Sequence, residues 1–182
     1  LISPEAEYEL HGEVGNVVFP TGAIVQGDTL SVYYGAADTR QCLANCSVSE
    51  LVDSMRATNK LFHINYDKYD GKLVRFEGNP ILSPVLEMDW QTNGVFNPAA
   101  VYEAGRVHIL YRAQAINGTS TFGYASSKDG FHIDENLDYP VYIPREDFEK
   151  KPYAMGNSGC EDPRLTKIGD KFYVTYIAYN GV

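Results

Sequence analysis

The sequence predicts an all-β fold of the β-propeller type, and three observations support this prediction. Long helical periodicity is nearly absent, short apolar segments are separated by Gly, Asp and Asn turns, and one hairpin pattern recurs along the chain. A strand pair cannot bury both of its faces alone, so a repeated hairpin implies similar sheets that stack around an axis. A β-sandwich with similar hairpins is the alternative that this pattern leaves open.

The recurring hairpin occupies residues 19–35, 96–112 and 161–176. Each copy has a polar or proline-bearing start, a short apolar strand, a turn with glycine, and a second strand rich in Tyr. A further strand is expected after the first two copies, at residues 41–47 and 121–127. In a propeller the innermost strand of each blade starts at the central axis, so the three starts are expected to converge there.

The other segments give fewer signals. Residues 47–55 predict a short amphipathic helix that Ser47 or Ser49 caps. Residues 60–84 predict a hairpin around the turn Asp70-Gly71. Residues 132–158 contain three prolines and little regular pattern, which indicates a long connection over one face of the fold.

Composition limits the partners and the compartment. The chain of 182 residues is the size of one domain, its net charge is −9, and 13% of its residues are aromatic. Such acidity argues against nucleic acid or an anionic membrane as a partner, and no apolar run is long enough to span a bilayer. Three cysteines without metal-ligand spacing predict reduced thiols in a cytoplasmic protein. Because the chain opens with Leu1, a periplasmic or secreted location stays open.

The strongest candidate for chemistry is the segment Gly159-Cys-Glu-Asp-Pro-Arg164, at the start of a predicted inner strand. Pro163 restricts the backbone of Asp162 and so orients its carboxylate, which acid or base work requires. In a regular strand Glu161 and Asp162 point to opposite sides, so only one of them is expected to face the site. A solvated turn with an ion pair to Arg164 is the plain structural alternative.

Two other repeats add candidate ligand-binding side chains. Asn97 offers an amide for hydroxyl groups, and Arg112, on the second strand of the same hairpin, is placed to reach a hydroxyl or the Asp162 carboxylate. Asp38 ends the second strand of the first repeat, where an Asp is also a common turn former. The four histidines lack metal-ligand spacing, so neither a metal nor an organic cofactor is expected.

Together these motifs resemble glycoside hydrolase family 130. The segments that carry the resemblance to the N-terminal part of such enzymes are 79–84 (NPILSP), Trp90, 95–101 (VFNPAAV), 111–113 (YRA), 126–130 (SSKDG) and 159–165 (GCEDPRL). Those that resemble the C-terminal part are 15–20 (GNVVFP), 30–38 (LSVYYGAAD) and 49–51 (SEL).

The resemblance implies a five-bladed β-propeller that cleaves β-linked mannosides with inversion, most simply by phosphorolysis with inorganic phosphate as co-substrate. Asp162 matches the general acid, which acts through a hydroxyl of the bound mannose. The matched sugar-binding positions are Asn97, Arg112, Asp38, Phe19, Glu161 and Arg164. Glu161 departs from the Tyr that some members carry at this position.

The order of the blocks departs from the family. Residues 1–56 resemble its last blade and residues 57–182 its first blades, and the blades between them have no counterpart in this sequence. The expected architecture is therefore a partial or rearranged ring, completed by a second copy of the chain. A β-mannoside hydrolase of the same family and a non-catalytic carbohydrate-binding propeller remain alternatives to the phosphorylase.

Overall fold

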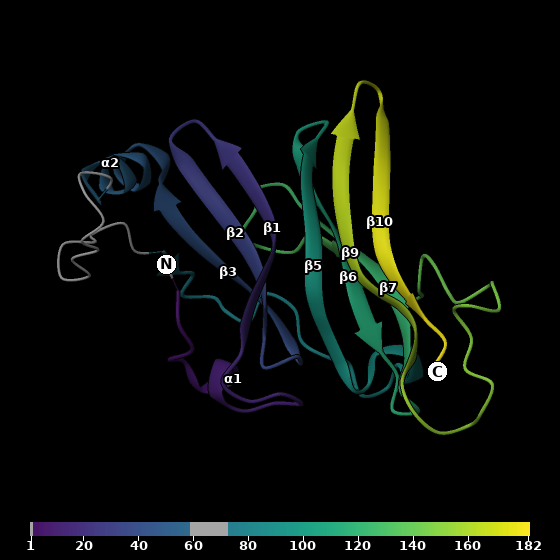
Figure 1. The fold of residues 1–182 in the computed structure, drawn as a ribbon. Coiled ribbons are helices and arrows are strands. Elements are labelled where there is room, and N and C mark those ends of the chain that lie inside the picture. Colours follow the sequence, from purple (N-terminus) through teal and green to yellow (C-terminus); the bar gives the residue numbers. More distant parts are fainter. Residues whose placement is uncertain (1, 59–72) are drawn as a thin grey trace.

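The computed structural model describes residues 2–58 and 73–182, which form two β-sheets with few helices (Figure 1). The first sheet has the antiparallel order β1 (Val18–Gln26), β2 (Thr29–Ala36), β3 (Arg40–Ser47) and β4 (Val74–Arg75). The second sheet has the order β10 (Lys171–Tyr179), β9 (Ser158–Ile168), β7 (Thr119–Ser127), β6 (Arg106–Gln114) and β5 (Gly94–Glu103), and β8 (Glu135–Asn136) pairs with β7. The predicted all-β fold is confirmed.

The three predicted hairpins are the pairs β1–β2, β5–β6 and β9–β10. Their first strands lie side by side, with β5 between β1 and β9 (Figure 1). The second sheet consists of two antiparallel units, β5–β6–β7 with β8 and β9–β10. The two units are joined by a short parallel pairing of β7 with β9, at Thr119–Ser158 and Ser120–Gly159. Over the described residues the sheets do not close into a ring, so the count of five blades is not confirmed.

A β-bulge interrupts each inner strand at the same place, next to its proline. The register shifts between Pro20 and Gly22 in β1 and between Phe96 and Ala99 in β5, and in β9 two residues face the single Tyr176 of β10. A bulge inserts an extra residue, bends the strand and changes the direction of its side chains. The prolines fit here because a bulge frees the chain from the ladder hydrogen bond that proline cannot donate.

The main core lies between the first sheet and the β5–β7 strands. Its buried members include Tyr33 and Leu43 from the first sheet and Val107, Ile109 and Tyr111 from β6. Tyr33 also donates a hydrogen bond of 2.7 Å to the carbonyl oxygen of Gly130, which ties the two sheets together at a polar point. The alternating apolar residues of β6 and the Tyr33 side of β2 therefore face each other and form this core.

The opposite face of the first sheet is covered by the N-terminal segment with α1 (Glu7–Leu10). Buried Glu9 accepts hydrogen bonds from the Tyr34 hydroxyl at 2.8 Å and from Arg75 Nε at 2.9 Å. Burial acts to raise the pKa of Glu9, but the bonds from Arg75, from two backbone N–H groups and from Tyr34 lower it to about 2. This carboxylate holds the N-terminal segment on the sheet.

The predicted helix is α2 (Val48–Thr58), and the Ser47 hydroxyl accepts a hydrogen bond of 3.2 Å from the Glu50 backbone N–H as predicted for a cap. The other short helix is the 3-10 turn η2 (Asp89–Gln91). The predicted Asp70-Gly71 turn lies outside the described residues. None of the described helices has the length and apolar character needed to cross a membrane.

The described cysteines form no disulfide: Cys42 and Cys160 are buried and Cys46 is half-buried. Burial raises the pKa of both the Cys42 and the Cys160 thiols to about 12. These thiols are therefore protonated and unreactive at neutral pH, as their predicted role in packing requires.

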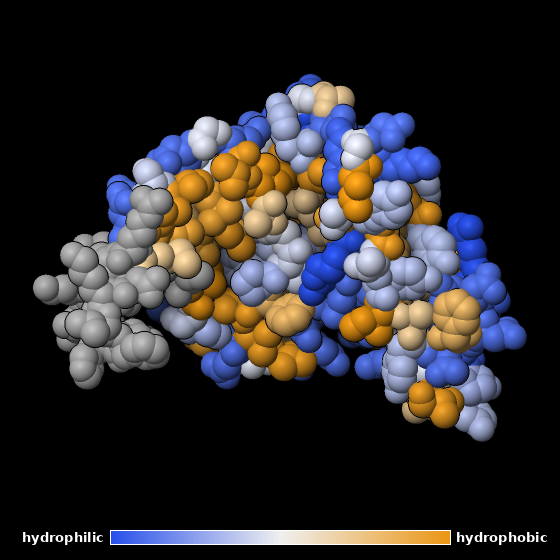
Figure 2. All heavy atoms as spheres, turned by 45° about the horizontal axis from the view of Figure 1, so that its top comes forward, coloured by the Kyte–Doolittle hydropathy of each residue, from blue (hydrophilic) through white to orange (hydrophobic). Residues whose placement is uncertain are grey.

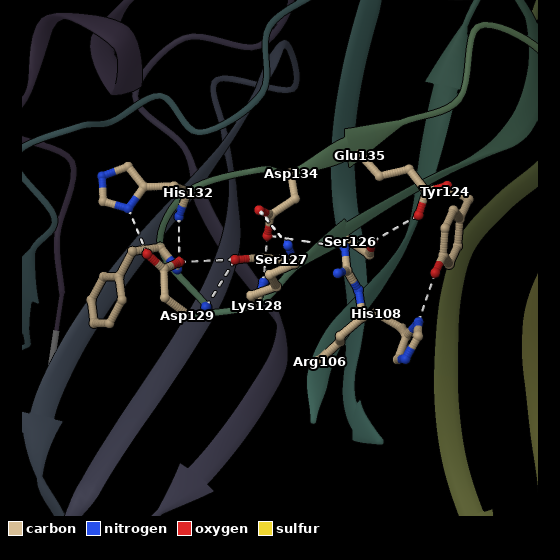
Figure 3. Close-up of polar contacts among 12 residues, drawn as sticks. Arg106, His108, Tyr124, Ser126, Ser127, Lys128, Asp129, His132, Asp134 and Glu135 are labelled. Atoms are coloured by element: carbon tan, nitrogen blue, oxygen red, sulfur yellow. Dashed lines mark hydrogen bonds and ion pairs between the residues drawn. The ribbon is translucent and has the colours of Figure 1, made fainter. Parts of the chain in front are cut away.

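The SSKDG motif forms a polar turn after β7 (Figure 3). Asp129 Oδ1 accepts hydrogen bonds of 2.8 Å from the backbone N–H groups of Phe131 and His132, and Oδ2 lies 2.7 Å from His132 Nδ1. The His132 bonds, and then the Phe131 bond, hold the pKa of Asp129 well below its usual range. This turn presents the Gly130 carbonyl to Tyr33, so the motif serves the packing of the two sheets.

Apolar surface remains exposed at two places. Figure 2 shows a broad apolar area on the face that it draws. The side chains of β10 are also largely exposed; among them are Phe172, Val174 and Ile177. Edge strands of this kind are usually covered in native proteins.

Candidate active site

Three predicted site residues meet at the starts of the inner strands. Asp162 Oδ1 accepts a hydrogen bond of 2.8 Å from Asn97 Nδ2 and lies 3.2 Å from Arg112 Nη1. Asn97 comes from β5, Arg112 from β6 and Asp162 from β9. The starts of two of the three repeats, at Asn97 and Asp162, are therefore in direct contact.

The bulges place these side chains. Asn97 and Asp162 both have left-handed backbones, with φ of 49° and 50°. Asn and Asp tolerate this conformation better than other non-glycine residues, so the residue types match the local geometry. The two repeats thus place a left-handed Asn or Asp, followed by proline, at equivalent bulges of β5 and β9.

The prediction that Glu161 and Asp162 point to opposite sides is wrong. Glu161 Oε1 lies 2.7 Å from Arg112 Nη2, while Asp162 contacts Nη1 of the same guanidinium. The expected alternation holds only in a regular strand, and the bulge at Asp162-Pro163 breaks it. Both carboxylates consequently belong to one site.

Arg112 is the centre of this site. Its Nε donates a hydrogen bond of 3.0 Å to the Ser120 hydroxyl, and its guanidinium carbon lies 4.8 Å from the centroid of the Phe96 ring. Sequence reasoning missed Ser120 and Phe96. Ser120 lies within an ordinary strand pattern, and only the parallel contact of β7 with β9 brings its hydroxyl to the site.

Gly35 makes room for Asn97. A Cβ atom on Gly35 would lie 2.6 Å from Asn97 Oδ1, so no other residue fits there without a shift. The neighbouring first sheet therefore approaches β5 closely at the site. Asn97 Oδ1 is buried and has no hydrogen-bond partner among the described residues, so an unsatisfied acceptor lies within the cluster.

Asp38 lies within electrostatic reach of the same cluster. Burial raises the pKa of its carboxyl most strongly, the Arg112 charge lowers it, and the charges of Asp162 and Glu13 raise it further, so that the net shift is upward. Asp38 has a left-handed backbone with φ of 49° in the middle of the turn between β2 and β3, which agrees with its alternative interpretation as a turn residue.

Glu161 shows a similar shift. Burial raises the pKa of its carboxyl, Arg112 lowers it, Asp162 raises it and the Ser120 hydroxyl lowers it, with a net upward direction. Glu161 and Asp162 thus contact the same guanidinium, and Asp38 lies within electrostatic reach of it. The raised pKa values of Glu161 and Asp38 are typical of acid and base sites, because each of these two carboxyls retains a proton more readily than it would in water.

The predicted pair Phe19 and Arg164 lies beside this cluster. The Arg164 guanidinium carbon is 5.8 Å from the centroid of the Phe19 ring, and Arg164 Nη1 donates to the carbonyl oxygens of Asp162 at 3.1 Å and Pro163 at 3.0 Å. Arg164 therefore contacts the backbone of Asp162 rather than its carboxylate. Phe19 keeps a large exposed fraction, 42%, and is accessible to a ligand.

The geometry suits proton transfer to a bound polar ligand. One carboxylate is held at a fixed place by an amide and a guanidinium, a second is half-buried next to it, and an aromatic ring is exposed nearby. Pyranose rings present hydroxyl groups at their edges and apolar C–H faces, which match this combination of amide, carboxylates and aromatic ring. Among the described residues, no group of His, Cys, Asp and Glu side chains is arranged to hold a metal ion.

Comparison with curated proteins finds mannoside phosphorylases. The chain is 36% identical over 126 residues to Beta-1,2-mannobiose phosphorylase of Thermoanaerobacter sp. (strain X514), and 36% identical over 115 residues to 1,2-beta-oligomannan phosphorylase of the same organism. These matches cover 60% and 59% of this chain, and 38% and 36% of the relatives. The chain therefore spans well under half the length of these relatives.

Solved structures of glycoside hydrolases also match this chain. A structure from work on GH130 glycoside hydrolases that target beta-1,2 mannosidic linkages in Candida mannan matches with a TM-score of 0.52 and 33% identity, over 58% of this chain and 34% of that chain. A GH43 beta-xylosidase/alpha-arabinofuranosidase from a compost microbial metagenome matches with a TM-score of 0.54 over 95% of this chain and 46% of that chain. At 12% identity the second match shows a shared fold only.

A family model matches almost the whole chain. The model of glycoside hydrolase family 130, described as beta-1,4-mannooligosaccharide phosphorylase, matches residues 1–57 and 64–182. This coverage includes all the residues of the cluster around Arg112. The chain belongs to glycoside hydrolase family 130.

Proposed function

We propose that this chain forms a β-mannoside-cleaving site that transfers a mannosyl group to inorganic phosphate with inversion. Asp162 is the general acid, and it passes its proton through a mannose hydroxyl to the departing glycosidic oxygen. The phosphate oxygen forms a bond to the anomeric carbon as the bond to the leaving oxygen breaks. Asn97, Arg112, Asp38, Phe19, Glu161 and Arg164 position the sugar and the acid.

One observation carries this proposal: Asp162, on the inner strand β9, is fixed by Asn97 of the inner strand β5 and by Arg112 of β6. A general acid must hold its carboxyl group at a constant place relative to the scissile bond. The relatives' names support phosphorolysis of mannosides. Phosphate itself requires positive charge, and the cluster around Arg112 holds more carboxylates than cations, so the phosphate-binding groups lie elsewhere in the complete site.

Phosphate-dependent product formation is the expected result when the chain meets its substrate. The protein is incubated with β-1,2-mannobiose and with β-1,4-mannobiose, because the relatives' names include both linkages. Inversion of a β-linkage gives α-mannose 1-phosphate, detected by ³¹P NMR. No product without phosphate and α-mannose 1-phosphate with phosphate supports the phosphorylase.

The same assay separates the two alternatives. Release of free mannose at the same rate without phosphate assigns the chain to hydrolysis, as in the family members that the Candida mannan work describes. Saturable binding of mannobiose by calorimetry without any product assigns it to a non-catalytic carbohydrate-binding propeller. Absence of both binding and product removes the proposed function.

We propose that the two blocks, residues 1–56 and 57–182, are the last and the first blades of a five-bladed ring. In a closed ring these blades are neighbours, and the contact of β1 with β5 supports such a placement. The bulges at equivalent points of three inner strands also support it. The chain as given then holds part of a rearranged ring.

A second copy of the chain is expected to complete the assembly. The exposed apolar side chains that alternate along one face of β10 (Tyr173 at 49%, Ile177 at 54% and Tyr179 at 39%) form a surface whose burial would favour association. Sedimentation equilibrium at micromolar concentration is expected to give twice the chain mass. Ile177→Lys should shift the protein toward monomer, and the matched exposed change Ile116→Lys should not; a wild-type monomer would contradict this proposal.

We also propose a cellular location, a class of partner and a co-substrate for the chain. The buried, protonated Cys42 and Cys160 thiols support a cytoplasmic location, where thiols stay reduced. The net charge of −9 supports a neutral sugar rather than a nucleic acid as the partner. Inorganic phosphate is the sole co-substrate in this proposal, without an organic cofactor.

A further inference from the structure

Ser120 lies where the two halves of the second sheet meet. It is fully buried on β7 and pairs with Gly159 of β9. Gly159 has φ of 118°, and a Cβ atom there would lie 2.1 Å from the Ser120 carbonyl oxygen. Glycine is therefore required at this contact, and the absence of a side chain brings the Ser120 hydroxyl next to the start of β9.

The hydroxyl connects Arg112 with Glu161. Arg112 Nε donates to Ser120 Oγ at 3.0 Å, and Ser120 Oγ donates to Glu161 Oε1 at 3.4 Å. A serine hydroxyl has one proton and two acceptor lone pairs, so it can accept from the guanidinium and donate to the carboxylate at once. The direction of these bonds is fixed because a guanidinium has no acceptor.

All three nitrogens of the Arg112 guanidinium therefore have a partner. Nε meets Ser120, Nη1 meets Asp162 and Nη2 meets Glu161. The Phe96 ring lies against the guanidinium at 4.8 Å. Partners at all three nitrogens define both the plane of the guanidinium and its rotation within that plane. Without Ser120, Nε has no partner, and the guanidinium can rotate about the remaining contacts.

We propose that Ser120 is a positioning residue that fixes the rotation of Arg112, and through it the place of Asp162, while its hydroxyl also donates a hydrogen bond to Glu161. The inference rests on the proposed function for its effect on turnover. Its structural part concerns only Arg112 and Glu161, and it can be tested whether or not the chain is active.

The first measurement is the NMR signal of the Arg112 Nε–H group. Ser120→Ala removes one oxygen atom and leaves Nε without its acceptor, so the Nε–H proton should exchange with water about tenfold faster than in the wild type. Thr121→Val is the matched control, because the adjacent Thr121 hydroxyl is buried and has no partner among the described residues. This control should leave the exchange rate unchanged.

The second measurement is the titration of the Glu161 carboxyl carbon by ¹³C NMR. Burial is the largest influence on the pKa of Glu161 and raises it, whereas the Ser120 hydrogen bond lowers it. Ser120→Ala should therefore move the Glu161 midpoint to higher pH, and Thr121→Val should not. A residue with only a packing role would move neither this midpoint nor the Arg112 exchange rate.

The third measurement is turnover. Ser120→Ala should lower kcat about tenfold with little change in KM, because the acid is misplaced while the sugar contacts remain. Ser120→Cys, which replaces the oxygen with a weaker acceptor, should be intermediate in all three measurements, and it serves in place of Ser120→Ala if that variant does not fold.

Two outcomes would overturn the inference. One is an Arg112 exchange rate and a Glu161 midpoint in Ser120→Ala that equal those of Thr121→Val. The other is an active wild type in which Ser120→Ala has normal kcat. If the wild type releases no product at all, the proposed function fails on its own, and the two NMR measurements still decide the role of Ser120.

Discussion

Asp162→Asn is expected to abolish mannoside cleavage while the protein remains folded. The amide keeps an oxygen that accepts from Asn97 and Arg112, but it has no proton to transfer. A positioned general acid contributes roughly 10²- to 10⁴-fold to the rate, so kcat should fall by that amount with a smaller change in KM. Initial rates of α-mannose 1-phosphate formation measure this effect.

The backbone makes Asn the right replacement. Asp162 has φ of 50°, which Asn tolerates and Ala tolerates poorly, so an alanine variant would mix backbone strain with the loss of the acid. Asp170→Asn, in the hairpin turn of the same two strands, is the matched control and should keep full activity. Normal turnover by a folded Asp162→Asn protein would eliminate Asp162 as the acid.

The sequence was informative about the hairpins because their signals are local. Alternating apolar residues, turn glycines and the recurring prolines predict the strands β1, β2, β5, β6, β9 and β10, and the structure confirms them. Equivalent strand starts also bring Asn97, Arg112 and Asp162 together as predicted. A repeated unit places repeated positions at equivalent points in space, which is why residues so far apart in the chain could be grouped.

The parts that could not be predicted depend on departures from regular strands and on contacts between sheets. The bulge turns Glu161 toward the same guanidinium as Asp162, although strand alternation predicts the reverse. The Ser120 contact arises from a short parallel pairing between residues 119–120 and 158–159, for which no local pattern exists. Residues 132–158 were expected to be a long connection, yet within them lies a fully buried carboxylate, Glu149.

Glu149 and Glu9 have the same structural role and the same kinds of hydrogen-bond partner. Glu149 accepts from the backbone N–H groups of Arg145 and Glu146 at 2.6 and 2.9 Å, and Glu9 accepts from those of residues 5 and 6 at 2.8 and 3.0 Å. Each also accepts from a tyrosine hydroxyl on the second strand of a hairpin, Tyr176 or Tyr34. Each carboxylate thus fastens the segment before an inner strand to that strand's own hairpin.

Glu149→Gln is therefore expected to destabilise the protein by about 3 kcal/mol at pH 7. A Gln side chain offers one acceptor oxygen and places an amide N–H against donors that a carboxylate accepts, and hydrogen bonds to a buried charge contribute about 1.5–3 kcal/mol each. Urea unfolding followed by fluorescence measures the difference. Glu146→Gln, an exposed carboxylate in the same turn, is the control and should change stability by less than about 0.5 kcal/mol.

The pH dependence of the stability difference between wild type and Glu149→Gln shows whether the variant acts through the lost charge or through altered packing. Burial acts to raise the pKa of Glu149, but the bonds from Tyr176, from the backbone of Glu146 and Arg145 and from Tyr142 lower it to about 2. A group whose folded pKa is lowered contributes its full stability above the unfolded pKa and loses it as the pH falls toward the folded pKa. The difference between wild type and Glu149→Gln should therefore be constant from pH 7 to about 5.5 and shrink between about 4.5 and 2. A difference that stays the same at pH 3 would show that the variant acts through packing, because the wild-type carboxylate would then contribute nothing through its charge.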